Sequence, residues 1–140
     1  MSLPRGFADL PWDDLDFLGW RDPGAPERAW LVAEREGRLV GLSLRVASGA
    51  ARGFTSRSIC SICLTTRTGG GVALLTARRT GAAGRQGNSI GQYMCADLAC
   101  PLYVRGKKDS AFGGDLDEHL SLAERIDRAL GNLFAFIDRL

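Results

Sequence analysis

The four cysteines of this 140-residue chain form two closely spaced pairs, Cys60-x₂-Cys63 and Cys95-x₄-Cys100. A zinc ion takes four soft ligands in a tetrahedron, and a Cys-x-x-Cys turn delivers two thiolates from one knuckle. A redox-active dithiol needs only one such pair, and structural disulfides are rare in a reducing compartment. We therefore predict one structural Zn²⁺ per chain, bound by all four cysteines. A disulfide and a redox dithiol are the alternatives.

The second cysteine pair requires a change of secondary structure between its two members. Positions five residues apart point about 140° away from each other on a helix, so Cys95 and Cys100 cannot both lie inside one. The segment 89–94 predicts a strand that runs into Cys95, and Pro101 suits the first position of a helix. Cys100 is then the N-cap, or Asp97 caps a helix that begins earlier. A knuckle, a hairpin and a strand-to-helix corner form a treble-clef zinc finger.

Catalytic residues are scarce outside the cysteines. Four cysteine ligands leave no coordination position for a water, which argues against zinc hydrolase chemistry. His119 is the only histidine, and we interpret it as a surface residue of a helix rather than as part of a catalytic set. The glycines of 81–87 lack the Gly-Lys-Ser/Thr of a phosphate loop and predict a hairpin tip. We therefore expect a protein that is not an enzyme.

The elements that must position the cysteines are mainly strands. Glu36-Gly37 lies between two apolar runs and predicts a β-hairpin, and glycine-rich stretches separate the later runs. The dense apolar residues between Phe7 and Trp20 are interrupted by Pro11 and predict a short helical turn or an ordered arm. The predicted strands are 28–34, 38–47, 57–60, 72–79 and 89–94, with loops at 47–56 and 81–87.

The C-terminal segment has the clearest periodicity of the chain, because its apolar residues recur at three- and four-residue steps. We predict one amphipathic helix there, with its charged face in solvent. The fold class is therefore α+β, with small antiparallel sheets or hairpins around a treble-clef zinc finger with four cysteine ligands, and a C-terminal amphipathic helix. A single domain spans 1–140, made of an arm and hairpin (1–56), the zinc finger (57–108) and the helix (109–140). The periodic residues are Leu116, Leu120, Ala123, Ile126, Leu130, Leu133, Phe134, Ile137 and Leu140.

The overall composition, with 45% hydrophobic and 24% charged residues, is that of a globular protein. No stretch approaches the roughly 18 uninterrupted apolar residues of a membrane span. The N-terminus is acidic and lacks the apolar run of a secretory signal. We expect a cytoplasmic monomer that does not bind a membrane.

Charge is strongly segregated along the sequence despite a net charge of only +2. Residues 41–110 carry 10 basic and 2 acidic side chains, whereas the segments on both sides are acidic. All four cysteines lie inside this basic block. Such a block favours binding of RNA or of an acidic protein surface. The candidates are Arg67, Arg78, Arg79, Arg85, Arg105, Lys107 and Lys108.

Several motifs resemble the treble-clef zinc domain of the elongation factor G-binding proteins, the family that includes the fusidic acid resistance proteins. The Cys-x₂-Cys and Cys-x₄-Cys combination is the most specific of them, and the resemblance covers almost the whole chain. It implies that the four cysteines bind zinc and that the domain binds elongation factor G, in resistance proteins releasing it from the ribosome. The motifs are Leu18-Gly-Trp-Arg-Asp-Pro23, Leu39-Val-Gly-Leu-Ser-Leu-Arg45, Cys60-Ser-Ile-Cys63, Leu75-Thr-Ala-Arg-Arg79, Gly84-Arg-Gln-Gly-Asn-Ser89, Tyr93-Met-Cys-Ala-Asp-Leu-Ala-Cys100 and Arg105-Gly-Lys-Lys108.

The resemblance has one departure, since resistance proteins place a helical bundle ahead of this domain and fewer than sixty residues precede Cys60 here. Binding of elongation factor G is thus better supported than resistance itself. The alternative is an RNA- or ribosome-binding zinc module, and a redox or metal-handling protein is a third class. The resemblance supplies no contact residues, so the predicted partner-binding residues are chosen from charge alone: Arg78, Arg79, Arg85, Lys107 and Lys108.

Overall fold

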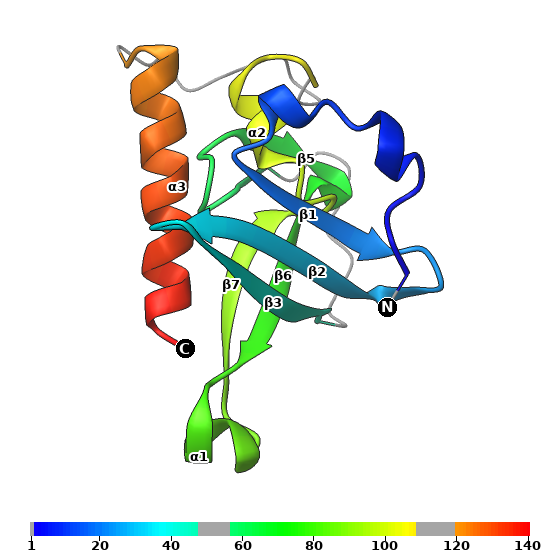
Figure 1. Cartoon of the computed structure of the whole chain (residues 1–140), viewed down its shortest axis with the longest axis vertical. Helices are drawn as coiled ribbons and strands as arrows, with labels where there is room; N and C mark the ends of the chain where they lie inside the picture. Colours follow the sequence, from blue (N-terminus) through cyan, green and yellow to red (C-terminus); the bar gives the residue numbers. More distant parts are fainter. Residues whose placement is uncertain (1, 48–56, 109–119) are drawn as a thin grey trace.

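The computed structural model describes residues 2–47, 57–108 and 120–140. Its strands form a five-stranded antiparallel sheet in the order β1-β2-β3-β6-β7 and a separate two-stranded sheet, β4-β5 (Figure 1). This arrangement confirms the predicted α+β class. The strands are β1 (Phe17–Asp22), β2 (Ala25–Arg35), β3 (Arg38–Val46), β4 (Arg57–Ile59), β5 (Thr66–Thr68), β6 (Val72–Arg78) and β7 (Ser89–Cys95).

Three α-helices complete the described fold: α1 (Gly81–Arg85), α2 (Cys100–Val104) and α3 (Leu122–Asp138). The long C-terminal helix is confirmed, and it begins at a capping box in which Ser121 and Glu124 bond each other's backbone amides. The predicted helical positions Leu116 and His119 lie outside the described residues. None of the helices in the described segments has the length and apolarity needed to span a membrane.

The predicted hairpin around Glu36-Gly37 is confirmed as β2-β3. Both turn residues have positive φ, 53° and 78°, as a two-residue turn between twisted strands requires. The end of strand β3 pairs with β6 of the zinc-finger segment, because Arg45 lies opposite Thr76 and Val46 opposite Leu75. One sheet therefore joins the N-terminal hairpin to the hairpin that carries Cys95.

The N-terminal arm is shorter than predicted. Residues Phe7–Asp9 and Trp12–Asp14 form 3₁₀ turns, but Phe17–Asp22 is strand β1 rather than part of a helical turn. Dense apolar residues give no clear period, so the pattern alone did not identify the strand. Pairing with β2 across the Pro23-Gly24 turn decides its conformation, and the register places Trp20 opposite Trp30.

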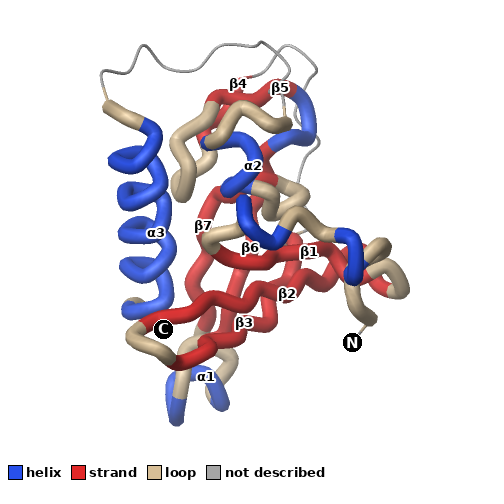
Figure 2. Tube along the Cα trace, turned by 45° about the horizontal axis from the view of Figure 1, so that its top comes forward, coloured by secondary structure: helices blue, strands red, loops and turns tan. Residues whose placement is uncertain are grey.

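The five-stranded sheet has two different faces. On the inner face, residues such as Leu31 and Leu44 are buried with the zinc finger and α3, whose Leu133 and Phe136 belong to the same core. Figure 2 shows α3 lying alongside the sheet. Sheet and zinc finger are in close contact, since a Cβ on Gly19 of β1 would lie 2.6 Å from the Leu98 Cβ. The outer face is covered only in part, by the N-terminal arm.

The predicted hairpin tip at 81–87 contains a helix, so the prediction of a simple loop is wrong. The Gln86 amide donates to the Ala82 carbonyl, and the Asn88 amide donates to the Ala83 carbonyl. These hydrogen bonds hold the short helix α1 and the turn that follows it. Gly87 then stops the helix with a φ of 88°. Small residues made this segment resemble a loop in the sequence, and hydrogen bonding between the ends of β6 and β7 closes it into a helix.

Candidate metal centre and basic surfaces

The four cysteine sulfurs come together in one buried cluster. The Sγ atoms of Cys60, Cys63, Cys95 and Cys100 all lie within 4.8 Å of one another. The Cys60–Cys100 and Cys63–Cys95 sulfurs are 3.6 and 3.5 Å apart. Disulfide sulfurs are bonded at about 2.05 Å, whereas zinc–sulfur bonds of about 2.3 Å place the corners of a tetrahedron about 3.8 Å apart. The cluster therefore fits a tetrahedral metal ion and contains no disulfide.

The first cysteine pair lies on the turn between β4 and β5. The amides of Ile62 and Cys63 both donate to the Cys60 sulfur at 3.4 Å, so the backbone of the turn fixes the position of this ligand. The Thr65 hydroxyl lies 3.0 Å from the Cys63 sulfur. The Asn132 side chain of α3 donates to the Ile62 carbonyl and holds the turn against the helix. These contacts form the zinc knuckle that the Cys-x-x-Cys spacing predicts.

The second pair lies on a strand end and a helix start, as predicted. Cys95 is the last residue of β7, and Cys100 is the first residue of α2. The N-cap is Ala99, so both predicted caps, Cys100 and Asp97, are wrong. Asp97 instead accepts a hydrogen bond from the Ala99 amide and so shapes the turn before the helix. The helix therefore begins one residue earlier than a Cys100 cap predicts and two residues later than an Asp97 cap predicts.

A polar layer next to the sulfurs places one buried cation, Arg67, beside the cluster. Arg67, which is only 8% exposed, donates to the Cys95 sulfur at 3.8 Å, and its guanidinium stacks on the Tyr103 ring at 3.5 Å. The Tyr103 hydroxyl donates to Asp97, which also pairs with Lys108. Four thiolates and one Zn²⁺ carry about −2, so a buried arginine beside the cluster lowers the cost of burying that charge.

Proton affinities within the cluster are far apart without a metal. Hydrogen bonds from Cys100, and then from Cys63 and Cys95, lower the pKa of Cys60. The hydrogen bond with Cys60 and burial raise the pKa of Cys100. A bound Zn²⁺ supplies the positive charge that keeps all four sulfurs deprotonated, and the filled tetrahedron gives it a structural role.

The sequence comparison with known families agrees with this geometry. The model of the FBP C-terminal treble-clef zinc-finger family matches residues 1–140, the whole chain. The chain belongs to this family. Searches of the curated proteins and of the solved structures found no match. As a treble-clef zinc finger, the protein uses Zn²⁺ to hold the knuckle, the β6-β7 hairpin and α2 together.

Basic residues near the zinc-finger cysteines are engaged within the protein. Arg105 forms a two-point ion pair with Asp16, at 2.7 and 2.9 Å. Lys107 pairs with Asp14 at 2.8 Å and Lys108 with Asp97 at 2.6 Å. Asp14 and Asp16 come from the acidic N-terminal segment, some ninety residues earlier. We call Arg67, Arg105, Lys107 and Lys108 the zinc-side cations.

The other predicted partner-binding residues lie at the far end of the β6-β7 hairpin. Arg78 ends β6, Arg79 follows it and Arg85 ends α1, and all three are exposed. Within the described residues their side chains form no ion pair or hydrogen bond. The two groups of predicted residues therefore differ: Lys107 and Lys108 have internal ion-pair partners, and the three arginines have none among the described residues.

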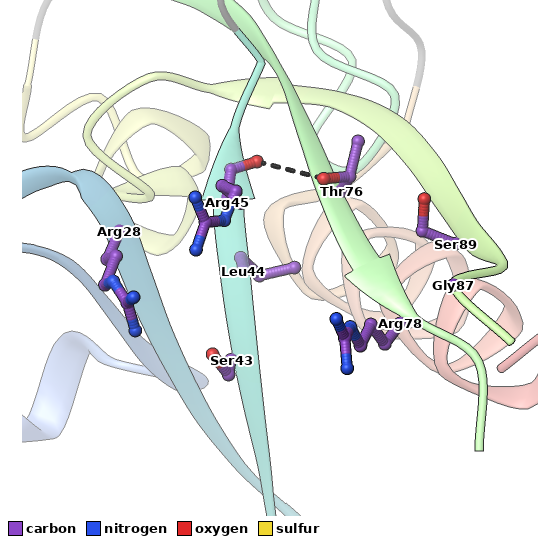
Figure 3. A pocket seen from close by; sticks show the side chains of 8 residues that line it. All are labelled: Arg28, Ser43, Leu44, Arg45, Thr76, Arg78, Gly87 and Ser89. Atoms are coloured by element: carbon purple, nitrogen blue, oxygen red, sulfur yellow. Dashed lines mark hydrogen bonds between the residues drawn. The ribbon is translucent and has the colours of Figure 1, made fainter. Parts of the chain in front are cut away.

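Two functional candidates were missed by counting charge along the sequence. Arg28 and Arg45 lie beside Arg78 in an open pocket of about 450 Å³ on the outer face of the sheet (Figure 3). We call Arg28, Arg45 and Arg78 the arginine pocket. Arg28 belongs to the N-terminal segment, whose net charge is negative, so the charge of the segment did not indicate it. The predicted Glu36-Gly37 turn was a usable signal, because a two-residue turn there places Arg28 opposite Arg45.

A second concave region on the same outer face is apolar. Its volume is about 440 Å³, and it lies between the N-terminal arm and strands β1 to β3. Leu39 is 77% exposed, Trp12 46% and Phe7 39%, although Phe7 and Trp12 contact each other edge to face. We call this region the apolar groove; its lining includes Leu3, Phe7, Trp12, Leu15, Leu18, Val32 and Leu39.

Proposed function

We propose that this protein is a non-enzymatic, cytoplasmic zinc-finger protein that binds elongation factor G and promotes its release from the ribosome, as fusidic acid resistance proteins do. The sequence motifs supply the identity of the partner, and family membership supports the domain type. A zinc site with four buried cysteines has no position for a substrate or a water. The protein therefore acts through its surface, and the zinc site stabilises the fold that forms this surface.

The apolar groove is the observation that favours a protein partner over RNA. Exposed Trp and Phe side chains beside a hydrophobic concavity are typical of the centre of a protein interface. RNA phosphates gain nothing from covering Leu39 or Trp12, whereas an apolar side chain from a protein partner removes both from water. The groove also shares the outer face of the sheet with the exposed Arg78, so a partner can meet apolar and cationic groups together.

The charge-based candidates now differ in how readily they can contact a partner. Arg78, Arg79 and Arg85 have no side-chain partner among the described residues, so contact with an acidic surface costs them no internal ion pair. Lys107 and Lys108 would have to leave Asp14 and Asp97. We therefore place the partner-facing charge on the three arginines, next to the β6-β7 hairpin tip.

Calorimetric titration of the zinc-loaded protein with purified elongation factor G tests the proposal. Leu39→Glu puts a charge into the apolar groove and should weaken binding at least tenfold, which corresponds to about 1.4 kcal/mol. Leu122→Glu is the matched control, since Leu122 is 43% exposed at the start of α3 and lies outside the groove. Absence of binding overturns the proposal, and an equal loss in both variants shows that the groove is not the contact surface.

Ribosome release needs its own assay. Elongation factor G held on ribosomes by fusidic acid sediments with them, and the protein should reduce the sedimented fraction in proportion to its concentration. Leu39→Glu should lose this effect and Leu122→Glu should retain it. A parallel titration with ribosomal RNA tests the alternative module: RNA binding with a steep salt dependence, in the absence of any affinity for the factor, would favour that function instead.

A further inference from the structure

Two arginines lie directly opposite each other on adjacent strands of the sheet. The register pairs Arg28 of β2 with Arg45 of β3, so both guanidinium groups project from the same, outer face. Like charges at directly opposed positions destabilise a sheet. Arg45 in turn pairs with Thr76 of β6, and Arg78 lies two residues further along on the same face. Three positive charges are thus collected on neighbouring strands.

The same hairpin contains a second opposed arginine pair that is neutralised internally. Arg35 pairs in register with Arg38. Both terminal nitrogens of Arg35 donate to the carboxylate of Asp138, and its guanidinium lies 4.9 Å from the Phe134 ring centroid. Helix α3 therefore supplies an acid to one arginine pair. No described acidic side chain forms an ion pair with Arg28 or Arg45.

The space among these arginines is a built concavity rather than a flat surface. The arginine pocket holds about 450 Å³ and is lined by Ser43 and Ser89 in addition to its three arginines. Figure 3 shows Ser43 on β3, with Arg28 of β2 on one side and Arg78 of β6 on the other. The Thr76 hydroxyl is used internally, as it donates to the Arg45 carbonyl at 3.3 Å. No aspartate, glutamate or aromatic side chain is among the described lining residues.

We propose that the arginine pocket binds the terminal phosphate or diphosphate of a small molecule. Three guanidiniums carry +3, which matches a dianionic or trianionic group better than the single charge of a phosphodiester. Serine hydroxyls add donors beside the guanidiniums. A lining without aromatic side chains offers no surface for stacking the bases of single-stranded RNA. The pocket shares Arg78 with the surface proposed for elongation factor G, but binding of a small anion here does not require the factor. It also accounts for an opposed arginine pair that has no acidic partner among the described residues.

Inorganic pyrophosphate is the probe for this site. NMR titration of the zinc-loaded protein at constant ionic strength should give saturable amide shifts at Ser43, Arg45 and Ser89. Arg45→Gln should weaken the binding at least tenfold. Arg38→Gln removes the same charge from the same strand outside the pocket, and it should change the affinity less than twofold. Both side chains are exposed, so neither substitution should unfold the protein. Thermal unfolding of both variants checks that they are folded.

Three results of this titration would overturn the proposal. Shifts that do not saturate, or that weaken equally in both variants, show only general attraction of anions to a basic surface. Tighter binding of an RNA oligonucleotide without terminal phosphates, or of a glutamate-rich peptide, assigns the pocket to another class of ligand. No elongation factor is present in the titration, so failure here leaves the proposed function untouched, and the reverse also holds.

Discussion

The zinc-side cations and the arginine pocket show that charge in the sequence and charge available to a partner are different quantities. Each of the four zinc-side cations has an internal partner: Arg67 contacts Cys95 and Tyr103, and the other three form ion pairs with aspartates. On the outer face of the sheet, the arginines of the pocket have no such partner among the described residues. The three most closely spaced basic residues of the sequence, Arg105, Lys107 and Lys108, are therefore neutralised by ion pairs with aspartates.

The difference has a topological cause. The acidic N-terminal arm passes next to α2, where Asp16 meets Arg105 across 89 residues of sequence. In the arginine pocket on the outer face, the cross-strand neighbours of the arginines are instead another arginine or hydroxyl residues, and no residue of the acidic arm is among the described lining residues. The following predictions test this contrast between the two regions.

Loss of zinc has the largest expected effect. Structural zinc contributes about 10–16 kcal/mol in small zinc domains, as much as the whole stability of a typical domain. Cys63→Ser, or a strong chelator added to the unchanged protein, should therefore unfold the chain, as measured by circular dichroism and by a loss of one zinc per chain in elemental analysis. Ser61→Ala, on the same knuckle, should keep the metal. Cooperative unfolding at an unchanged temperature in the chelator would contradict a structural site.

Removal of the buried zinc-side arginine should have the next largest effect. Arg67→Gln loses the stack on Tyr103 and the hydrogen bond to the Cys95 sulfur, and a desolvated cation–π contact is worth about 2 kcal/mol. Arg67→Lys keeps the charge but not the planar group, so it should recover only part of the loss. Urea unfolding of the zinc-loaded variants measures both. Equal stability of all three proteins would show that Arg67 does not support the metal site.

The same substitution should have opposite signs in the two regions. Arg105→Gln breaks the two-point pair with Asp16 and should lower the free energy of unfolding by about 1 kcal/mol. Arg45→Gln removes an opposed like charge and should raise it by about 0.2–1 kcal/mol at low salt. Urea unfolding at low and high salt gives both values.

Salt is the control for this last comparison. Screening should shrink the Arg45→Gln change more than the Arg105→Gln change, because Arg28 and Arg45 are exposed whereas the side chains of Arg105 and Asp16 are only 13% and 15% exposed. If Arg45→Gln destabilises the protein as much as Arg105→Gln does, the arginine pocket has an internal partner and the contrast between the regions is wrong.

The strongest sequence predictions concerned features with fixed local chemistry. Cysteine spacing predicted the knuckle and the strand-to-helix corner, since each depends on a few neighbouring residues. Period-3.6 apolar residues predicted α3, and Glu36-Gly37 predicted the β2-β3 turn. The errors occurred where local signals were weak: strand β1 had no clear alternation, α1 had only small residues, and the cap of α2 moved to Ala99.

By itself, the sequence determined which ligands bind the metal, because four thiolates at these spacings leave few other chemical uses. It also determined the family and the position of the β2-β3 turn. Only the tertiary structure decided which cations have internal partners, since an ion pair such as Asp14 with Lys107 joins residues 93 positions apart. Electrostatic energy depends on distance in space, and a count along the chain contains no such distance.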